Sequence, residues 1–183
     1  SCFDKADLIL VIGQNPGTNH PRMLSALASC KRTGGSIVSI NPLEETGMRR
    51  FKHPQEVLSM IGSGTKIADD HFPVNINGDA ALLKGLVKVI LEEGQLDWDF
   101  IDTHTEGFEE FKQSAEAANW DDIVDGSGIS RERITKLGMA VARSKRLIIC
   151  WAMGLTQHRN SVSVIQEIAN LLLMGGHFGR PGA

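Results

Sequence analysis

The stretch DLILVIGQNPGTNHPR, residues 7–22, decides the fold. Its apolar run ends at Gly13 and shows no polar alternation, which is typical of a strand buried on both faces of a parallel sheet. A turn of Asn, Pro, Gly and Thr follows, and Pro21 suits the first turn of a helix. This order of strand, glycine turn and helix is the one that forms ligand sites at the carboxyl edge of open α/β sheets.

The rest of the chain repeats this alternation of strands and helices. Further strands are expected at Ser36–Ile40, at Phe72–Ile76 and at Arg146–Ala152. Pro73 has no amide N–H to donate, so the third of these belongs at an edge of the sheet. Main helices are expected to begin at Pro21 and Ser130 and to cover residues 80–93 and 161–174, with shorter helices at 54–61, 98–104 and 107–117. Met153–His158 is expected to be the loop after the last strand.

We therefore predict an α/β fold, with a doubly wound, mostly parallel sheet, Rossmann-like, that carries helices on both faces. Residues 1–183 are expected to form a single domain with a helical acidic insertion at about 95–126. The insertion holds about half of the carboxylates of the chain and is most simply a solvated helical face. The glycine-rich end after Met174 suggests a domain excised from a larger multidomain enzyme.

Composition narrows the classes of partner. The net charge of −3 argues against nucleic acid as the main partner, and no apolar run reaches the length of a membrane span. Cys2, Cys30 and Cys150 share no C-x-x-C spacing, and their odd number argues against a disulfide framework. A reducing compartment and a cytoplasmic localisation are expected.

Three strand ends carry the residues that suit a ligand. The loops 13–19, 41–45 and 153–157 are rich in Gly, Asn and Gln, and in a parallel sheet they lie along one edge. The loop 13–19 matches neither the G-x-G-x-x-G fingerprint nor a P-loop, so a plain turn between strand and helix remains an alternative for it. The histidines and cysteines form no cluster, so no metal site is expected from this chain alone. No catalytic residue is assigned.

Asp79 is the clearest single candidate for a residue that binds a ligand. A carboxylate can accept two parallel hydrogen bonds, which is the pattern offered by the N1 and N2 edge of guanine. The alternative is that Asp79 caps the helix that begins beside it.

Five segments together resemble the molybdopterin oxidoreductase family, and within it the branch of formate dehydrogenase alpha subunits and YdeP-like proteins. They are GQNPGTNHPR, NGDAAL, EEGQLDWDFIDTHTEGFEEF, WAMGLTQH and NLLLMGGHFGRPGA, and they cover nearly the whole chain in the family's order. The resemblance implies that the chain binds molybdopterin guanine dinucleotide. It assigns contacts with this cofactor to Gly13, Gln14, Asn15, His20, Ile40, Asn41, Pro42, Glu44, Asn77, Gly78, Asp79, Met153 and Gln157.

The resemblance also implies what surrounds the chain. The parent enzyme would use molybdenum or tungsten, while the metal ligand and any iron–sulfur cluster would lie outside residues 1–183. Its partners would be the other domains of the same polypeptide and an electron-transfer subunit, and the isolated chain would be inactive. Many relatives have Asp and Arg where this chain has Asn41-Pro42-Leu43. Two alternatives stay open: a degenerate scaffold or subunit-docking domain of the same fold, and the central domain of a thiamine-diphosphate enzyme.

Overall fold

A computed structural model describes residues 2–52 and 64–183, and the chain divides into two compact units. Unit 1 spans Ser1–Pro73, Arg146–Gly154 and Pro181–Ala183, and unit 2 spans Val74–Lys145 and Leu155–Arg180. The single domain over residues 1–183 stays a prediction. In the described part, no helix combines the length and the apolar character needed to cross a membrane.

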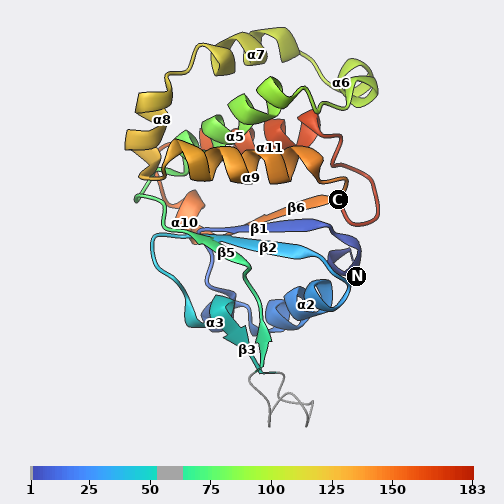
Figure 1. Cartoon of the computed structure of the whole chain (residues 1–183), viewed down its shortest axis with the longest axis vertical. Coiled ribbons are helices and arrows are strands. Elements are labelled where there is room, and N and C mark those ends of the chain that lie inside the picture. Colours follow the sequence, from blue (N-terminus) through green and yellow to red (C-terminus); the bar gives the residue numbers. More distant parts are fainter. Residues whose placement is uncertain (1, 53–63) are drawn as a thin grey trace. The chain divides into compact units, whose positions relative to one another are not determined.

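Unit 1 is built on a parallel four-stranded sheet (Figure 1). Its strands are β1 (Leu8–Ile12), β2 (Ser36–Ile40), β5 (Asp70–Phe72) and β6 (Leu147–Trp151), in the order β5-β2-β1-β6. Leu8 is in register with both Ser36 and Leu147, and all five residues of β1 are buried. The predicted α/β class with a mostly parallel sheet is confirmed.

Helix α2 (Pro21–Arg32) covers one face of this sheet. Its residues Leu24, Leu27 and Ala28 are buried and belong to the same core cluster as Ile9 and Ile37 of the strands. Short elements complete unit 1: η1 (Phe3–Lys5), α1 (Pro16–Asn19), α3 (Thr46–Arg49) and the antiparallel pair β3 (Arg50–Phe51) and β4 (Thr65–Lys66).

Three predictions for the sheet region need comment. β5 ends at Phe72 rather than running from 72 to 76, because Pro73 has no N–H to continue the ladder. Its position at the edge of the sheet is confirmed. The helix expected at Pro54–Ile61 lies outside the described residues. Residues 153–156 form a short helix, α10 (Met153–Thr156), instead of a loop.

Unit 2 is helical. It contains α5 (Asp79–Glu93), α6 (Trp98–His104), α7 (Phe108–Glu116), α8 (Trp120–Ser127), α9 (Arg131–Arg143) and α11 (Ser161–Met174). α5 lies at its centre and packs against α7, α8, α9 and α11 (Figure 1). α9 starts where predicted because the Ser130 side chain accepts a hydrogen bond from the N–H of Arg133. α8 was not predicted.

The cysteines of unit 1 differ sharply in their surroundings, and this difference is testable. Cys2 is exposed, whereas burial raises the pKa of the Cys150 thiol to about 11. The thiolate is the reactive form, so we expect iodoacetamide at pH 8 to label Cys2 readily and Cys150 very slowly, with Cys150 labelling rising as the pH approaches 11. Peptide mass spectrometry on the native protein measures both rates. Equal labelling of the two thiols at pH 8 would contradict the burial of Cys150.

Candidate functional site

The loops after β1 and β6 meet through two glycines. Gly13 follows β1 with a φ of 57°, donates its N–H to the carbonyl oxygen of Ile40 at 2.9 Å, and accepts the N–H of Gly154 at 3.1 Å. A Cβ atom on Gly154 would lie 2.5 Å from the oxygen of Gly13. The predicted convergence of the ends of β1, β2 and β6 is therefore present in unit 1, and it depends on backbone contact.

Gln14 has a buried side-chain oxygen atom without a hydrogen-bond donor among the described residues. It is 7% exposed, and its Nε2 lies 3.3 Å from Nδ1 of His20 and donates to the sulfur of Met23 at 3.3 Å. Its Oε1 is buried and accepts no hydrogen bond from the described residues. A buried acceptor without a donor costs about 1–3 kcal/mol, so this atom suits a donor supplied by a ligand.

Asn15 and Asn41 are joined by Glu45, a residue that the sequence did not single out. Asn15 accepts the N–H of Thr18 at 3.1 Å and donates Nδ2 to Oε2 of Glu45 at 2.6 Å. Nδ2 of Asn41 donates to Oε1 of the same carboxylate at 3.4 Å. Glu45 thus holds the loop after β1 against the turn after β2, which fixes the shape of this edge.

Replacing Glu45 tests this link. Hydrogen bonds to a charged group contribute about 1.5–3 kcal/mol, so we expect Glu45→Ala to lower the free energy of unfolding by about that amount. Glu45→Gln can still accept from one of the two asparagines and should lose less. Glu44→Ala is the matched control, because Glu44 is exposed and its ion pair with Arg49 is 3.5 Å long. Urea unfolding of the full-length parent protein measures all three, and equal losses for Glu44→Ala and Glu45→Ala would contradict the assignment.

The remaining predicted residues of unit 1 differ in exposure. Ile40 is fully buried, and its carbonyl oxygen accepts the hydrogen bond from the N–H of Gly13. His20 and Pro42 are exposed, as is Met153, at 62% of its surface. These exposed groups are available to a ligand at the same edge, together with the apolar side chain of Leu43.

In unit 2, the predicted motif Asn77-Gly78-Asp79 forms a tight turn into α5. Asn77 has a φ of 64°, and the N–H of Gly78 donates to the oxygen of Asn75 at 2.8 Å. A Cβ on Gly78 would lie 2.6 Å from the oxygen of Gly126, so a glycine is required here. Gly78 is the N-cap of α5 and Asp79 is its first residue. The interpretation of Asp79 as the N-cap is therefore wrong.

Asp79 is a buried carboxylate whose surroundings oppose its charge. It is 6% exposed, and burial raises its pKa above the ordinary value, although its own backbone N–H and the nearby His158 act in the other direction. The amino end of α5 also favours an anion. Gln157, the other predicted residue of unit 2, is exposed and lies between α10 and α11.

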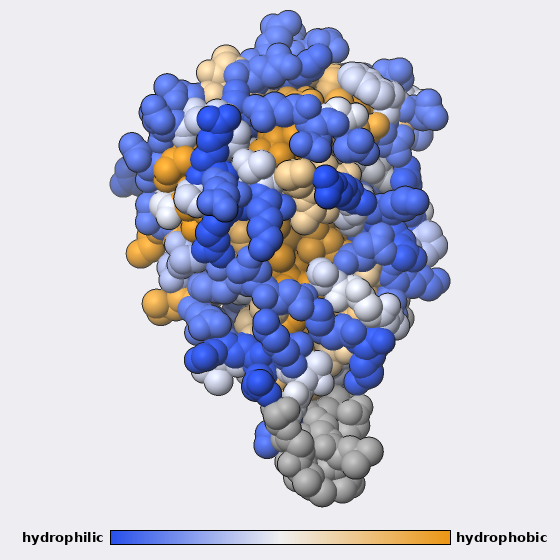
Figure 2. Space-filling model, in the orientation of Figure 1, coloured by the Kyte–Doolittle hydropathy of each residue, from blue (hydrophilic) through white to orange (hydrophobic). Residues whose placement is uncertain are grey.

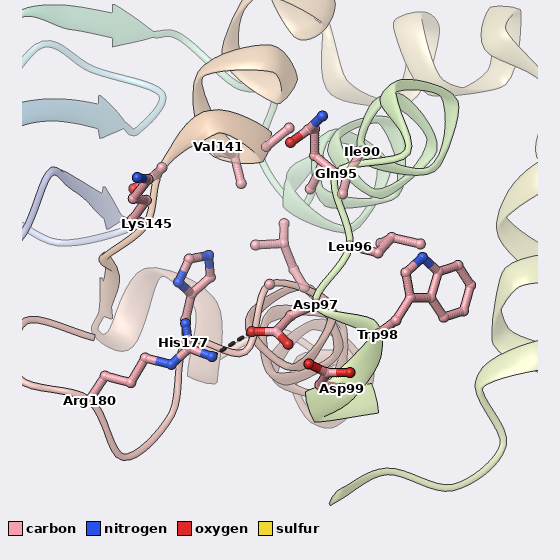
Figure 3. Close-up of a pocket in the computed structure, with 14 residues that line it drawn as sticks. Ile90, Gln95, Leu96, Asp97, Trp98, Asp99, Val141, Lys145, His177 and Arg180 are labelled. Carbon is pink, nitrogen blue, oxygen red and sulfur yellow. Dashed lines mark hydrogen bonds and ion pairs between the residues drawn. The ribbon is translucent and has the colours of Figure 1, made fainter. Parts of the chain in front are cut away.

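A hollow of about 470 Å³ in unit 2 contains none of the predicted residues (Figure 3). It lies at the carboxyl ends of α5, α9 and α11, where Asp97 is ion-paired with Arg180 and His177 is buried. Figure 3 shows the carboxylate of Asp97 directed toward the guanidinium of Arg180, a contact that joins the start of α6 to the turn after α11. This contact explains how the glycine-rich turn is held. In the described residues, no three His, Cys, Asp or Glu side chains are placed to hold a metal ion.

Comparisons with known proteins agree with these features. YdeP of Escherichia coli K12 is 43% identical over 192 residues, which cover 99% of this chain and 25% of that protein. Formate dehydrogenase H of the same organism is 30% identical over 182 residues, covering 99% of this chain and 23% of its own length. The solved structure of acetylene hydratase from Pelobacter acetylenicus shares the fold, with a TM-score of 0.81 at 23% identity over 97% of this chain and 22% of its own.

These relatives are about four times as long as the chain, which spans about a quarter of their length. The family model described as molybdopterin oxidoreductase matches residues 1–183, the whole of this sequence. The similarity to YdeP and to formate dehydrogenase H confirms the branch suggested by the sequence motifs. The chain therefore belongs to the molybdopterin oxidoreductase family.

Proposed function

We propose that this chain binds molybdopterin guanine dinucleotide in a molybdenum- or tungsten-dependent oxidoreductase of the formate-dehydrogenase-like branch. The observation that carries the proposal is Asp79, a buried carboxylate at the start of α5 that does not serve as the N-cap. An unbound protein bears the cost of this buried charge, and a ligand that donates two hydrogen bonds would offset it. The N1 and N2 groups of guanine are such donors.

The residues of unit 1 would hold the remainder of the dinucleotide. The buried Oε1 of Gln14 needs a donor, and the backbone contact of Gly13 with Gly154 leaves no side chain between these two loops. Asn41, Pro42 and Glu44 would contact the nucleoside, with Glu45 fixing the turn that presents them. We propose that His20 and Met153 of unit 1, and Gln157 of unit 2, contact the cofactor through their exposed side chains.

When bound, the cofactor would supply the redox chemistry, through its metal and dithiolene sulfurs. The chain would supply binding and orientation only. The metal ligand, any iron–sulfur cluster and the substrate pocket would belong to other parts of the parent polypeptide, which would pass electrons to a separate subunit. Cytoplasmic localisation and the inactivity of the isolated chain stay predictions.

Cofactor analysis of the full-length parent tests the proposal. The protein is produced in a host that makes the cofactor, its metal is measured by mass spectrometry, and nucleotides are released by acid hydrolysis. We expect molybdenum or tungsten together with GMP. Protein free of both metal and GMP would favour the alternative of a degenerate scaffold, and AMP or thiamine diphosphate in place of GMP would contradict the guanine assignment.

A further inference from the structure

The end of α8 is capped by Asn75, a residue from outside that helix. The last carbonyl groups of a helix have no hydrogen-bond partners within it. The N–H of Asn75 donates to the carbonyl oxygen of Ser127 at 2.9 Å. Its Nδ2 lies 3.3 Å from the carbonyl oxygen of Asp125 and 3.4 Å from that of Gly126. Asn75 therefore joins three consecutive carbonyl groups of α8 to the segment that leads into α5.

Asn75 also closes the turn that precedes Asp79. Its carbonyl oxygen accepts the N–H of Gly78 at 2.8 Å, across Asn77 with its φ of 64°. Gly78 itself lies against the end of α8, since a Cβ on it would lie 2.6 Å from the carbonyl oxygen of Gly126. Asp79 follows Gly78 directly, so the end of α8 determines where the backbone of Asp79 begins.

Gly128, the C-cap of α8, leaves the space that the side chain of Asn75 occupies. It has a φ of 73°, and a Cβ on it would lie 2.6 Å from Oδ1 and 2.8 Å from Nδ2 of Asn75. Ser127 beside it is fully buried, and its Oγ accepts the N–H of Ile129 at 3.2 Å. All of these contacts lie within unit 2, and they hold whichever surfaces of the chain are covered in the parent protein.

We propose that Asn75 is a positioning residue for guanine recognition, which holds Asp79 where its carboxylate accepts both hydrogen bonds from the base. This inference rests on the function proposed for Asp79. Two parallel hydrogen bonds require both carboxylate oxygens to be placed at once, because a hydrogen bond weakens steeply as its angle departs from linear. A turn released from α8 would keep the carboxylate but lose this placement.

Asn75→Ala in the full-length parent removes the side-chain donors and keeps both backbone hydrogen bonds. We expect freshly isolated variant protein to release its cofactor about fivefold faster than the parent, the effect of losing a neutral hydrogen bond. GMP retained per mole of protein during dialysis measures the rate. In the Asp79→Asn background the same change should alter the rate by less than about twofold, because the group that Asn75 positions is then already altered. A purely structural role would give equal factors in both backgrounds.

Gly128→Ala tests the same contact from the side of α8. The added methyl group would displace the Asn75 side chain, so we expect release as fast as in Asn75→Ala. Gly94→Ala is the matched control: Gly94 is also a C-cap, with a φ of 65°, but a Cβ on it would meet no atom within 4 Å. It carries similar backbone strain and should release the cofactor at the parent's rate. Circular dichroism checks folding, and either test variant alone decides the question.

Two further controls separate stability from cofactor binding. Asn119→Ala removes the N-cap at the other end of α8, where the side chain accepts the N–H of Asp121 at 2.7 Å. It should lower the urea midpoint and leave the release rate unchanged. Gln113→Ala changes an exposed amide of α7, in the mainly hydrophilic region at the top of Figure 2, and should alter neither quantity.

The outcomes distinguish this inference from the proposed function. Asn75→Ala and Gly128→Ala proteins that release the cofactor at the parent's rate would overturn the positioning role. Equal effects of Asn75→Ala in the two backgrounds would overturn it as well. In both of these cases Asp79→Asn still loses its GMP, and the proposed function stands. An Asp79→Asn protein that retains full GMP would instead contradict guanine recognition by Asp79, and the positioning role would fall with it.

Discussion

Asp79→Asn is expected to remove most of the guanine nucleotide from the purified parent enzyme. The asparagine keeps one acceptor but places an amide N–H₂ where guanine also presents a donor, and it removes the charge that strengthens both hydrogen bonds. Losing a hydrogen bond to a charged group costs about 1.5–3 kcal/mol, which corresponds to about 10- to 150-fold weaker binding. GMP released per mole of protein measures the effect.

The same substitution should stabilise the protein that lacks the cofactor. The pKa of Asp79 is raised in the folded state, so the folded protein holds this proton more tightly than the unfolded chain. Stability from this group is present at low pH and decreases as the pH rises through the raised pKa of Asp79. Asp79→Asn removes that decrease, and its unfolding free energy should exceed that of the parent at neutral pH.

Asp102→Asn is the matched control, since Asp102 is an exposed aspartate of α6. It should change neither GMP content nor the stability of the cofactor-free protein. An Asp79→Asn protein that retains full GMP would contradict the role of Asp79 in guanine binding. One that keeps its nucleotide but loses stability would show that Asp79 is structural.

Gly154→Ala is expected to open the contact between the loops after β1 and β6. Alanine in a helix such as α10 normally stabilises a protein by about 0.5–1 kcal/mol relative to glycine. Here the added Cβ would lie 2.5 Å from the oxygen and 2.6 Å from the Cα of Gly13, which are backbone atoms that cannot move aside. Overpacking of this kind costs about 1–3 kcal/mol, so we expect a net loss of stability and reduced cofactor content.

Thr156→Ala, an exposed change in the same helix, is the control and should stay within about 0.5 kcal/mol of the parent. Urea unfolding and GMP content measure both variants. If Gly154→Ala is more stable than the parent, helix propensity outweighs packing and the close approach of the two loops is not a constraint.

Much of the fold could be predicted because local signals agreed with the final packing. Ser36–Ile40 and Ser161–Met174 have the predicted bounds, since their apolar patterns are long and end at turn residues. Several short elements were missed, among them α8 and α10, and the four residues of α10 are too few for a helical period to be recognised. Pro73 indicated the edge position of β5, but the start of this strand at Asp70 depends on its pairing with Val38 of β2.

The candidate site was predictable in part for a similar reason. Gly13 and Asp79 stand out from local motifs, so the sequence could indicate them. Glu45 could not be found this way, because its partner Asn15 lies 30 positions away and the pairing exists only in the folded chain. The capping interpretation of Asp79 failed by one position, since Gly78 can occupy the N-cap without a side chain.

A structure of the full-length parent with its bound cofactor tests the central claim most directly. We predict that the carboxylate oxygens of Asp79 lie within hydrogen-bond distance of the N1 and N2 atoms of a guanine. A dinucleotide bound with its guanine away from Asp79, or bound without contact to residues 1–183, would contradict the proposed function of this chain.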